Sequence, residues 1–159
     1  MAIKKILVPV DFSDDALNAL RYAQELGRTF KAELLILHVV EPIYYATPAD
    51  MYVTSPNLAM LLDEQRTLAT QQLARLSASL KAKGQRHRTL LKTGTPAQLI
   101  TDTAQSTKAD LIVMSTHGRT GLAHILLGST TEKVVRHAGC PVLTIRHGTE
   151  KRRKRNAQK

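Results

Sequence analysis

The chain has 159 residues, the length of one average domain. Hydrophobic residues make up 43% and charged residues 23%, which is ordinary for a globular protein and excludes wholesale disorder. No stretch approaches about 18 consecutive apolar residues, so a membrane-spanning helix is not expected, and the N-terminal stretch lacks the pattern of a secretory signal. The single cysteine, Cys140, excludes an intramolecular disulfide and indicates a reducing compartment, the cytoplasm.

The net charge of +10 is unevenly distributed along the chain. Residues 149–159 contain six basic and one acidic side chain, so half of the net charge lies in a segment with almost no apolar residues. Such a segment has nothing to bury, and we expect a folded domain at 1–148 and a disordered basic tail at 149–159. The chain has no Trp, and no aromatic residue is interleaved with the basic cluster, so nucleic-acid binding is not expected.

The predicted elements alternate between strand and helix. Near-continuous apolar runs indicate buried strands, and apolar residues at helical spacing indicate helices. In chain order, the expected elements are a strand at 3–10, a helix capped by Ser13, a strand at 34–40, an irregular connection at 41–57, a helix at 58–80 that closes near Gly84 and whose leucines pack in the core, a more polar edge strand at 87–92, a short helix from Pro96, a strand at 110–115, a helix at 129–138 and a strand at 141–146.

This alternation predicts a parallel sheet with helices on both faces. Doubly wound sheets of this kind bind ligands beyond the carboxyl ends of their strands. Two groups of residues directly follow predicted strands, namely Pro9–Asp11 and Ser115–Gly121. In the second group, Gly118 and Gly121 permit close backbone approach, and Arg119 has the length and charge to reach a phosphate.

The start of the helix at 129–138 is a second candidate for anion binding. Ser129 and Glu132 have the spacing of a capping box, which predicts a helix N-terminus at Gly128–Ser129. Backbone N–H groups at such an end, together with the hydroxyls of residues 129–131, would form a phosphate cradle. The alternative is that the glycines of both segments only form turns and that Ser129 only caps the helix.

Other chemistries lack their motifs. The chain has no P-loop, no dinucleotide fingerprint after the first strand and no nucleophile elbow, and its six histidines do not have metal-site spacing. His38 lies within an apolar strand, which favours packing over ligation. Cys140 stands between a helix end and a strand start, which favours a buried, inert thiol. Asp11 has no partner acid nearby in the sequence, so we expect it to bind rather than to catalyse, and we predict no catalytic residue and no metal site.

Four segments of the chain together resemble the universal stress protein family: residues 7–11, His38–Val39, Met114 to Glu132, and Cys140 to Leu143. The resemblance extends from Ile3 to Arg146. It implies a flavodoxin-like (Rossmann-like) α/β domain, which together with the alternation predicts a five-stranded sheet in the order 3-2-1-4-5. It also implies a homodimer formed through the last strand, here Pro141–Arg146, an exposed apolar edge that is expected to be paired.

One branch of this family binds ATP through a motif of glycine, two residues, glycine, nine residues, then glycine and Ser or Thr. Gly118 and Gly128–Ser129 fit this motif, whereas Ser115 stands at the first glycine position. By this resemblance, Asp11 and Val39 meet the adenine or ribose, and the phosphates are held by Gly118, Arg119, Gly128, Ser129 and Thr130. The full expected set of cofactor-binding residues is Pro9, Val10, Asp11, Val39, Met114, Ser115, His117, Gly118, Arg119, Gly121, Gly128, Ser129, Thr130 and Thr131.

Two functions follow from the resemblance. The first is a cytoplasmic stress-response module that binds an adenine nucleotide, ATP with or without magnesium, and hydrolyses it slowly at most. The second is a dimeric stress-response interaction protein that binds no nucleotide. The presence of Gly118 and Gly128–Ser129 favours the first.

Overall fold

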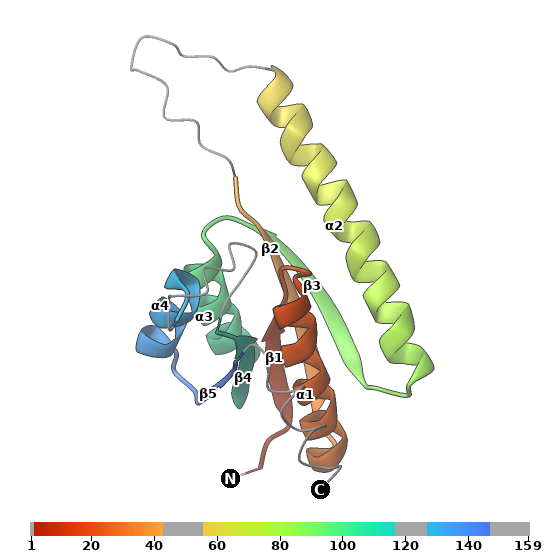
Figure 1. Ribbon diagram of the computed structural model, residues 1–159, viewed down its shortest axis with the longest axis vertical. Helices are drawn as coiled ribbons and strands as arrows, with labels where there is room; N and C mark the ends of the chain where they lie inside the picture. Colours follow the sequence, from red (N-terminus) through yellow and green to blue (C-terminus); the bar gives the residue numbers. More distant parts are fainter. Residues whose placement is uncertain (1, 43–55, 117–126, 147–159) are drawn as a thin grey trace, which may run out of the picture.

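The computed structural model describes residues 2–42, 56–116 and 127–146. Within these residues, strands and helices alternate as the sequence predicts, and their bounds lie within two residues of the expected ones (Figure 1). The elements are β1 (Lys5–Pro9), α1 (Asp14–Phe30), β2 (Glu33–Val40), α2 (Pro56–Ala82), β3 (His87–Thr93), α3 (Pro96–Thr107), β4 (Leu111–Ser115), α4 (Ser129–His137) and β5 (Val142–Ile145).

The strands form one parallel sheet in the order β3-β2-β1-β4-β5, which confirms the predicted topology. The chain winds outward from β1 to β3, crosses back through α3 to β4 and continues to β5. Strand order therefore reverses between β1 and β4, and this is the position where open α/β sheets bind ligands.

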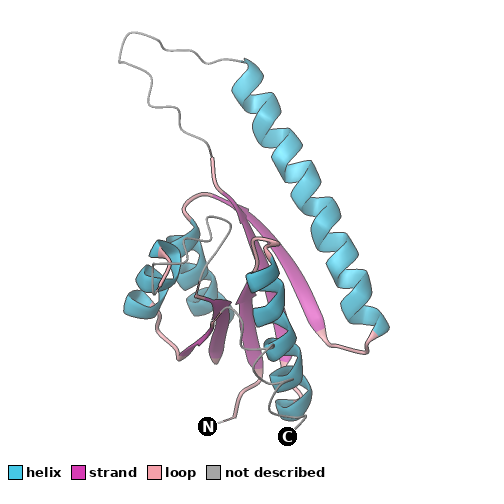
Figure 2. Ribbon diagram, viewed as in Figure 1, coloured by secondary structure: helices cyan, strands magenta, loops and turns pink. Residues whose placement is uncertain are grey.

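Helices cover both faces of the sheet (Figure 2), so its central strands are buried on both sides, which explains their nearly continuous apolar runs. Successive side chains of a strand point to opposite faces. Ile6, Val8 and Ile36 therefore pack toward α1 and α2, whereas Leu7 and Leu35 pack toward α3 and α4. The two outer strands are the least buried, and β3 is an edge strand, as its polar sequence predicts.

Helix α1 begins as the sequence predicts. The Ser13 hydroxyl oxygen accepts a hydrogen bond from the backbone N–H of Ala16 at 3.2 Å, which satisfies one of the N–H groups that a helix start leaves without an internal partner. Asp14 and Asp15 lie in the first turn, where their negative charge is favourable toward the helix dipole. This end of α1 follows the residues that leave β1 and is therefore fixed beside the carboxyl edge of the sheet.

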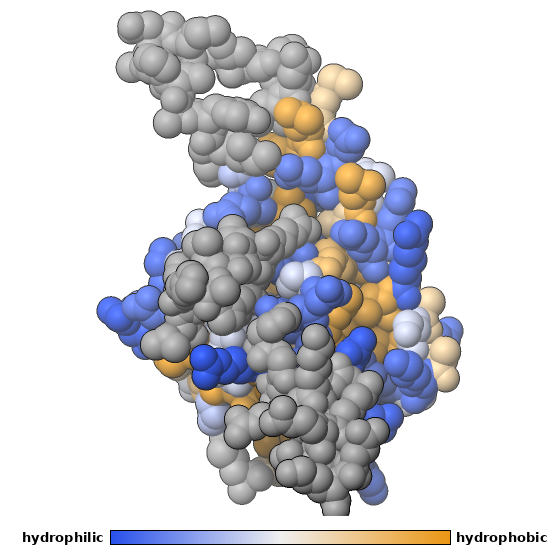
Figure 3. Space-filling view, in the orientation of Figure 1, coloured by the Kyte–Doolittle hydropathy of each residue, from blue (hydrophilic) through white to orange (hydrophobic). Residues whose placement is uncertain are grey.

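Helix α2 differs from the sequence prediction in how much of it is buried. Leu73 and Leu80, in its C-terminal half, are buried against the sheet. By contrast, Met60, Leu61 and Leu68 are 69%, 45% and 53% exposed, so the expectation that the leucines of this helix all pack in the core was wrong. The N-terminal half of α2 extends past the carboxyl edge of the sheet, and apolar side chains lie at the surface along it (Figure 3).

Among the described helices, none combines the length and the apolar character that crossing a membrane requires. The predicted basic tail at residues 149–159 lies outside the described residues.

Candidate nucleotide site

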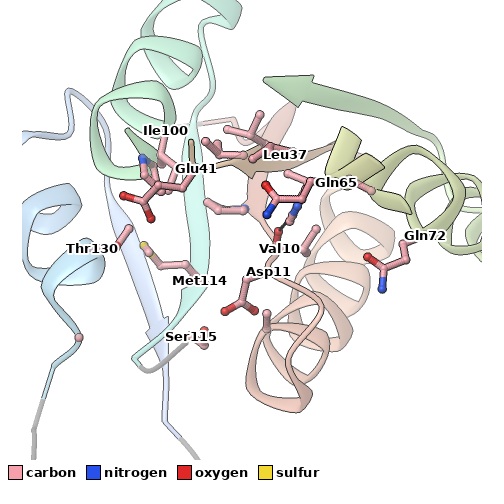
Figure 4. Close-up of a pocket in the computed structure, with 18 of the residues that line it drawn as sticks. Val10, Asp11, Leu37, Glu41, Gln65, Gln72, Ile100, Met114, Ser115 and Thr130 are labelled. Carbon is pink, nitrogen blue, oxygen red and sulfur yellow. Dashed lines mark hydrogen bonds between the residues drawn. The ribbon is translucent and has the colours of Figure 1, made fainter. Parts of the chain in front are cut away.

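A cleft of about 830 Å³ opens at the carboxyl ends of β1, β2 and β4 (Figure 4). The start of α4 lines one side of it and a face of α2 lines another. The volume lies within the range of small-molecule binding sites, about 300–1,000 Å³. The cleft therefore has both the size and the position expected of a ligand site in a doubly wound sheet.

The turn after β1 brings Asp11 to the cleft. The Asp11 Oδ1 atom accepts hydrogen bonds from the Ser13 N–H at 3.0 Å and from the Ser13 hydroxyl at 2.6 Å. Ser13 thus holds the carboxylate of Asp11 and caps α1 with the same hydroxyl. Figure 4 shows the Asp11 carboxylate directed into the cleft, where it can accept further hydrogen bonds from a ligand.

The end of β2 forms the floor of the cleft beside β1. The Val10 N–H donates to the Leu37 carbonyl at 2.8 Å, which continues the β1–β2 pairing to the edge of the cleft. Val39 lines the cleft and is half-buried, and Glu41, which follows the strand, lines it with an exposed carboxylate. An apolar side chain next to accessible backbone is suited to contact a flat aromatic ring.

The end of β4 is tied to α4 by two hydrogen bonds. The buried Thr131 hydroxyl donates to the Ser115 carbonyl at 3.0 Å, and the Gly128 N–H donates to the Thr116 carbonyl at 2.8 Å. Ser115 belongs to β4, and its φ is not positive. The backbone at Ser115 therefore does not require the glycine that the family motif has there.

Helix α4 begins at the predicted place but not by the predicted cap. Gly128 is the N-cap residue, with φ −65° and ψ 150°, and Ser129 is the first residue of the helix. No side-chain hydrogen bond caps this end, so the capping box predicted between Ser129 and Glu132 was wrong. Glu132 instead pairs with Arg136 at 2.8 Å on the exposed face of the helix. Among the residues that the structure describes, no side-chain cap therefore occupies the N–H groups of the first turn of α4.

Charge in the described part of the cleft is sparse. Its charged lining residues are Asp11, Glu41 and Arg75. The residues that the structure describes contain no group of three or more His, Cys, Asp or Glu side chains that could hold a metal ion. Within the described lining, an anion would meet a favourable field at the N-terminus of α4 and beside the Arg75 guanidinium.

The structure brings together every predicted site residue that it describes. The ten residues that line the cleft are Pro9, Val10, Asp11, Val39, Met114, Ser115, Gly128, Ser129, Thr130 and Thr131. The other four, His117, Gly118, Arg119 and Gly121, lie outside the described residues.

Sequence reasoning missed the wall formed by α2. Gln65, Ala69, Gln72 and Arg75 line the cleft from this helix (Figure 4). Their spacing of three and four residues places them on one helical face, and this spacing was the one feature of the sequence that grouped them. It could not show that the face borders a ligand site, because α2 is separated from the other lining elements by long stretches of chain.

Cys140 lies away from the cleft, between α4 and β5. It is half-buried rather than buried, and burial together with the nearby Asp110 carboxylate raises the pKa of its thiol. A raised pKa keeps the thiol protonated near neutral pH, so the structure is consistent with the inert cysteine predicted from the sequence.

Comparison with known proteins identifies the family. The model of the universal stress protein family matches residues 2–146. Universal stress protein MJ0531 of Methanocaldococcus jannaschii is 37% identical over 144 residues, which cover 90% of this chain and 82% of that protein. The structure of universal stress protein UspA from Lactobacillus plantarum superposes with a TM-score of 0.81 at 34% identity, covering 92% of this chain and 99% of that one.

Two more distant structures share the fold and contain nucleotides. A universal stress protein in complex with cAMP matches at 23% identity with a TM-score of 0.68, covering 92% of this chain and 98% of that one. A universal stress protein family protein from Arabidopsis thaliana with AMP bound matches at 22% identity with a TM-score of 0.65, covering 93% of this chain and 94% of that one. The match to the family model includes the cleft residues at both ends of the chain, Pro9–Asp11 and Gly128–Thr131. Because the family model matches residues 2–146, a family member is 37% identical and the fold with its five-stranded parallel sheet superposes on a family structure, this chain belongs to the universal stress protein family.

Proposed function

We propose that this protein is a stress-response module that binds an adenine nucleotide, ATP in particular, in the cleft at the carboxyl ends of β1, β2 and β4. The observation that carries the proposal is the convergence of three separate segments on one cleft. The turn after β1, the end of β2 and the start of α4 all line it, and each contains residues that the family resemblance associates with the nucleotide. The two distant relatives that contain cAMP and AMP support an adenine nucleotide as the ligand class.

The polar groups of the cleft suit the separate parts of a nucleotide. In this proposal, the Asp11 carboxylate accepts hydrogen bonds from the ribose hydroxyls, and the adenine ring lies against Val39. The phosphates lie at the start of α4, where the N–H groups of residues 129–131 and the helix dipole favour negative charge. The hydroxyls of Ser129 and Thr130 add further donors there.

Ser115 is compatible with this placement. Because its φ is not positive, a side chain at this position does not strain the backbone. Its carbonyl already accepts the Thr131 hydroxyl, so the end of β4 is held against α4 without a ligand. The departure from the glycine of the family motif therefore reduces the space near the ligand by a single hydroxymethyl group.

Magnesium would enter this site together with the nucleotide. The described residues contain no cluster of carboxylates or imidazoles that could hold the ion by themselves. Mg²⁺ usually keeps several waters and binds through substrate phosphates with one or two protein oxygens. In this proposal the protein hydrolyses ATP slowly at most.

The test has two steps. Native mass spectrometry of freshly purified protein detects adenine nucleotide that has co-purified with it. Titration calorimetry with ATP and magnesium, AMP, cAMP and GTP then gives the affinities, and we expect the adenine nucleotides to bind more tightly than GTP. Absence of measurable binding of any adenine nucleotide at millimolar concentration would contradict the proposal and leave the interaction protein without nucleotide as the function.

The same proposal includes a homodimer formed at Pro141–Arg146. Strand β5 is an edge of the sheet, Leu143 on it is 38% exposed, and Val135 on α4 nearby in sequence is 49% exposed. An edge strand with apolar side chains is a template for pairing with another chain. Light scattering should give the mass of a dimer at micromolar concentration, and a monomer would contradict this part. The site of action we expect, the cytoplasm, is supported by the single cysteine of the chain.

A further inference from the structure

Phe12 has an unusual backbone conformation next to the cleft. Its φ is +64°, in the left-handed region that bulky residues rarely adopt. It lies directly between Asp11, which lines the cleft, and Ser13, which holds the Asp11 carboxylate and caps α1. Strained residues of this kind persist only where their surroundings hold them, and they gather at functional sites.

His38 on β2 holds this turn at two points. Its ring packs against the Phe12 ring, with 4.5 Å between the centroids and 39° between the planes. Its Nδ1 atom lies 2.6 Å from the Val10 carbonyl oxygen. A carbonyl oxygen can only accept, so Nδ1 carries the proton and donates.

The contacts from β2 fix the backbone on both sides of Val10. The Val10 N–H donates to the Leu37 carbonyl at 2.8 Å, and the Val10 carbonyl accepts from the neighbouring His38. His38 is only 7% exposed, so its ring cannot move far without disturbing the core. The conformation of the turn that presents Asp11 is therefore determined by a side chain of the neighbouring strand.

We propose that His38 is a positioning residue, which holds Phe12 in the left-handed conformation and so keeps the Asp11 carboxylate directed into the cleft. The inference rests on the proposed function, in which Asp11 receives the ribose hydroxyls. Packing in the core alone would be served equally well by leucine or phenylalanine. Neither of these can donate to the Val10 carbonyl, so packing alone does not account for a histidine at the position.

Two substitutions separate the two contacts. His38→Phe keeps a ring of similar size but removes the donor to Val10. His38→Asn keeps an N–H donor at nearly the place of Nδ1 but removes the ring that contacts Phe12. Both variants should fold, because each retains one contact, and thermal unfolding monitors this.

The ligand pair ATP and 2′,3′-dideoxy-ATP reports on Asp11 specifically. The dideoxy compound has no ribose hydroxyl for Asp11 to bind, whereas its base and phosphates are unchanged. For a residue other than glycine, the left-handed conformation is less stable than the right-handed one by about the free energy that corresponds to a tenfold change in affinity. Without His38 to hold Phe12 in this conformation, the turn relaxes, and both His38 variants should bind ATP about tenfold more weakly. Their affinity for dideoxy-ATP should stay within about twofold of the parent.

Phe12→Gly provides the control for the backbone. Glycine adopts a left-handed conformation without a steric penalty, so the turn no longer needs the ring of His38. In this background, His38→Asn should change ATP affinity by less than about twofold, against about tenfold in the parent background.

The outcomes distinguish this inference from the proposed function. If the parent binds both nucleotides but the His38 variants lose affinity for both alike, the nucleotide function stands and the positioning role is refuted. If the parent binds neither nucleotide, the proposed function fails, and NMR chemical shifts of the Phe12 backbone decide the positioning role without a ligand. Phe12 should leave the left-handed region in the His38 variants, and a Phe12 that stays there would overturn the inference.

Discussion

Gly128→Val tests the phosphate end of the proposed site. Gly128 has φ −65° and ψ 150°, a conformation that any L-residue adopts, so valine does not strain the backbone there. The hydrogen bond from the Gly128 N–H to the Thr116 carbonyl can also remain. The substitution therefore adds a branched side chain at the start of α4 without straining the backbone.

The expected loss of affinity follows from the groups at this helix end. No side chain in the described part of the chain caps α4, and the N–H groups of its first turn are the donors proposed for the phosphates. A hydrogen bond to a charged group contributes about 1.5–3 kcal/mol, which corresponds to roughly a 10- to 150-fold change in affinity. If the valine side chain displaces the phosphate from one such donor, ATP should bind at least about tenfold more weakly.

Gly139→Val is the matched control. Gly139 is exposed, lies after the other end of α4, and a Cβ placed on it would have no neighbouring atom within 4 Å. Calorimetry with ATP and magnesium should show parent-like affinity for this variant, and thermal unfolding should show both variants folded. Valine at an N-cap is less favourable than glycine, so Gly128→Val should lose up to about 1 kcal/mol of stability.

Two results would refute the reasoning. Parent-like ATP affinity in Gly128→Val would show that no phosphate lies against the start of α4. An equal loss of affinity in Gly128→Val and Gly139→Val would show that the effect comes from a general disturbance of α4 and not from contact with the ligand.

Four further predictions follow from the same geometry. Ser115→Gly should lower stability by about 0.5–1 kcal/mol, because glycine weakens a strand, and should change ATP affinity by less than about threefold; a tenfold gain would show that the serine crowds the ligand. Thr131→Val should cost about 1–3 kcal/mol in urea denaturation, because the buried Ser115 carbonyl loses its donor, and an unchanged midpoint would contradict this. Ser129→Ala should leave stability within about 0.5 kcal/mol of the parent, since Ser129 is not the cap, whereas a loss of about 1 kcal/mol would indicate a capping role after all. Burial and the Asp110 carboxylate raise the pKa of the Cys140 thiol in the fold, so the native state favours the protonated thiol. The contribution of this thiol to stability should be fully present at neutral pH and should decline as the pH rises past the pKa of the unfolded thiol. Iodoacetamide should therefore alkylate the folded protein at higher pH than the unfolded chain.

Local signals in the sequence located the elements accurately. Apolar runs such as residues 34–37 are buried on both faces of the sheet, so their pattern is nearly independent of the rest of the fold. The cap at Ser13 depends only on residues within one helical turn, and it forms as predicted. The capping box at Ser129 failed although its spacing was right, because the chain enters α4 through Gly128 and makes Ser129 the first helical residue.

The candidate site was predictable in part. Residues that directly follow β1 and β4 could be assigned to one edge because all parallel strands end at the same edge of a sheet. The contribution of α2 could not be predicted in this way. Leu73 and Leu80 share the face of the helix that is buried against the sheet, whereas Leu68, five residues before Leu73, lies on another side of the helix, where it is exposed and lines the cleft.

The sequence by itself therefore determined the strands, the helices, the alternation between them and the segments that reach the carboxyl edge of the sheet, because these depend on neighbours within one element. Only the tertiary structure decided which face of α2 borders the cleft, that Ser115 needs no positive φ, and that His38 reaches the turn after β1 to contact Phe12 and Val10. These features depend on side chains that are far apart in sequence and meet only after the strands have paired. No periodicity or local propensity in the chain encodes them directly.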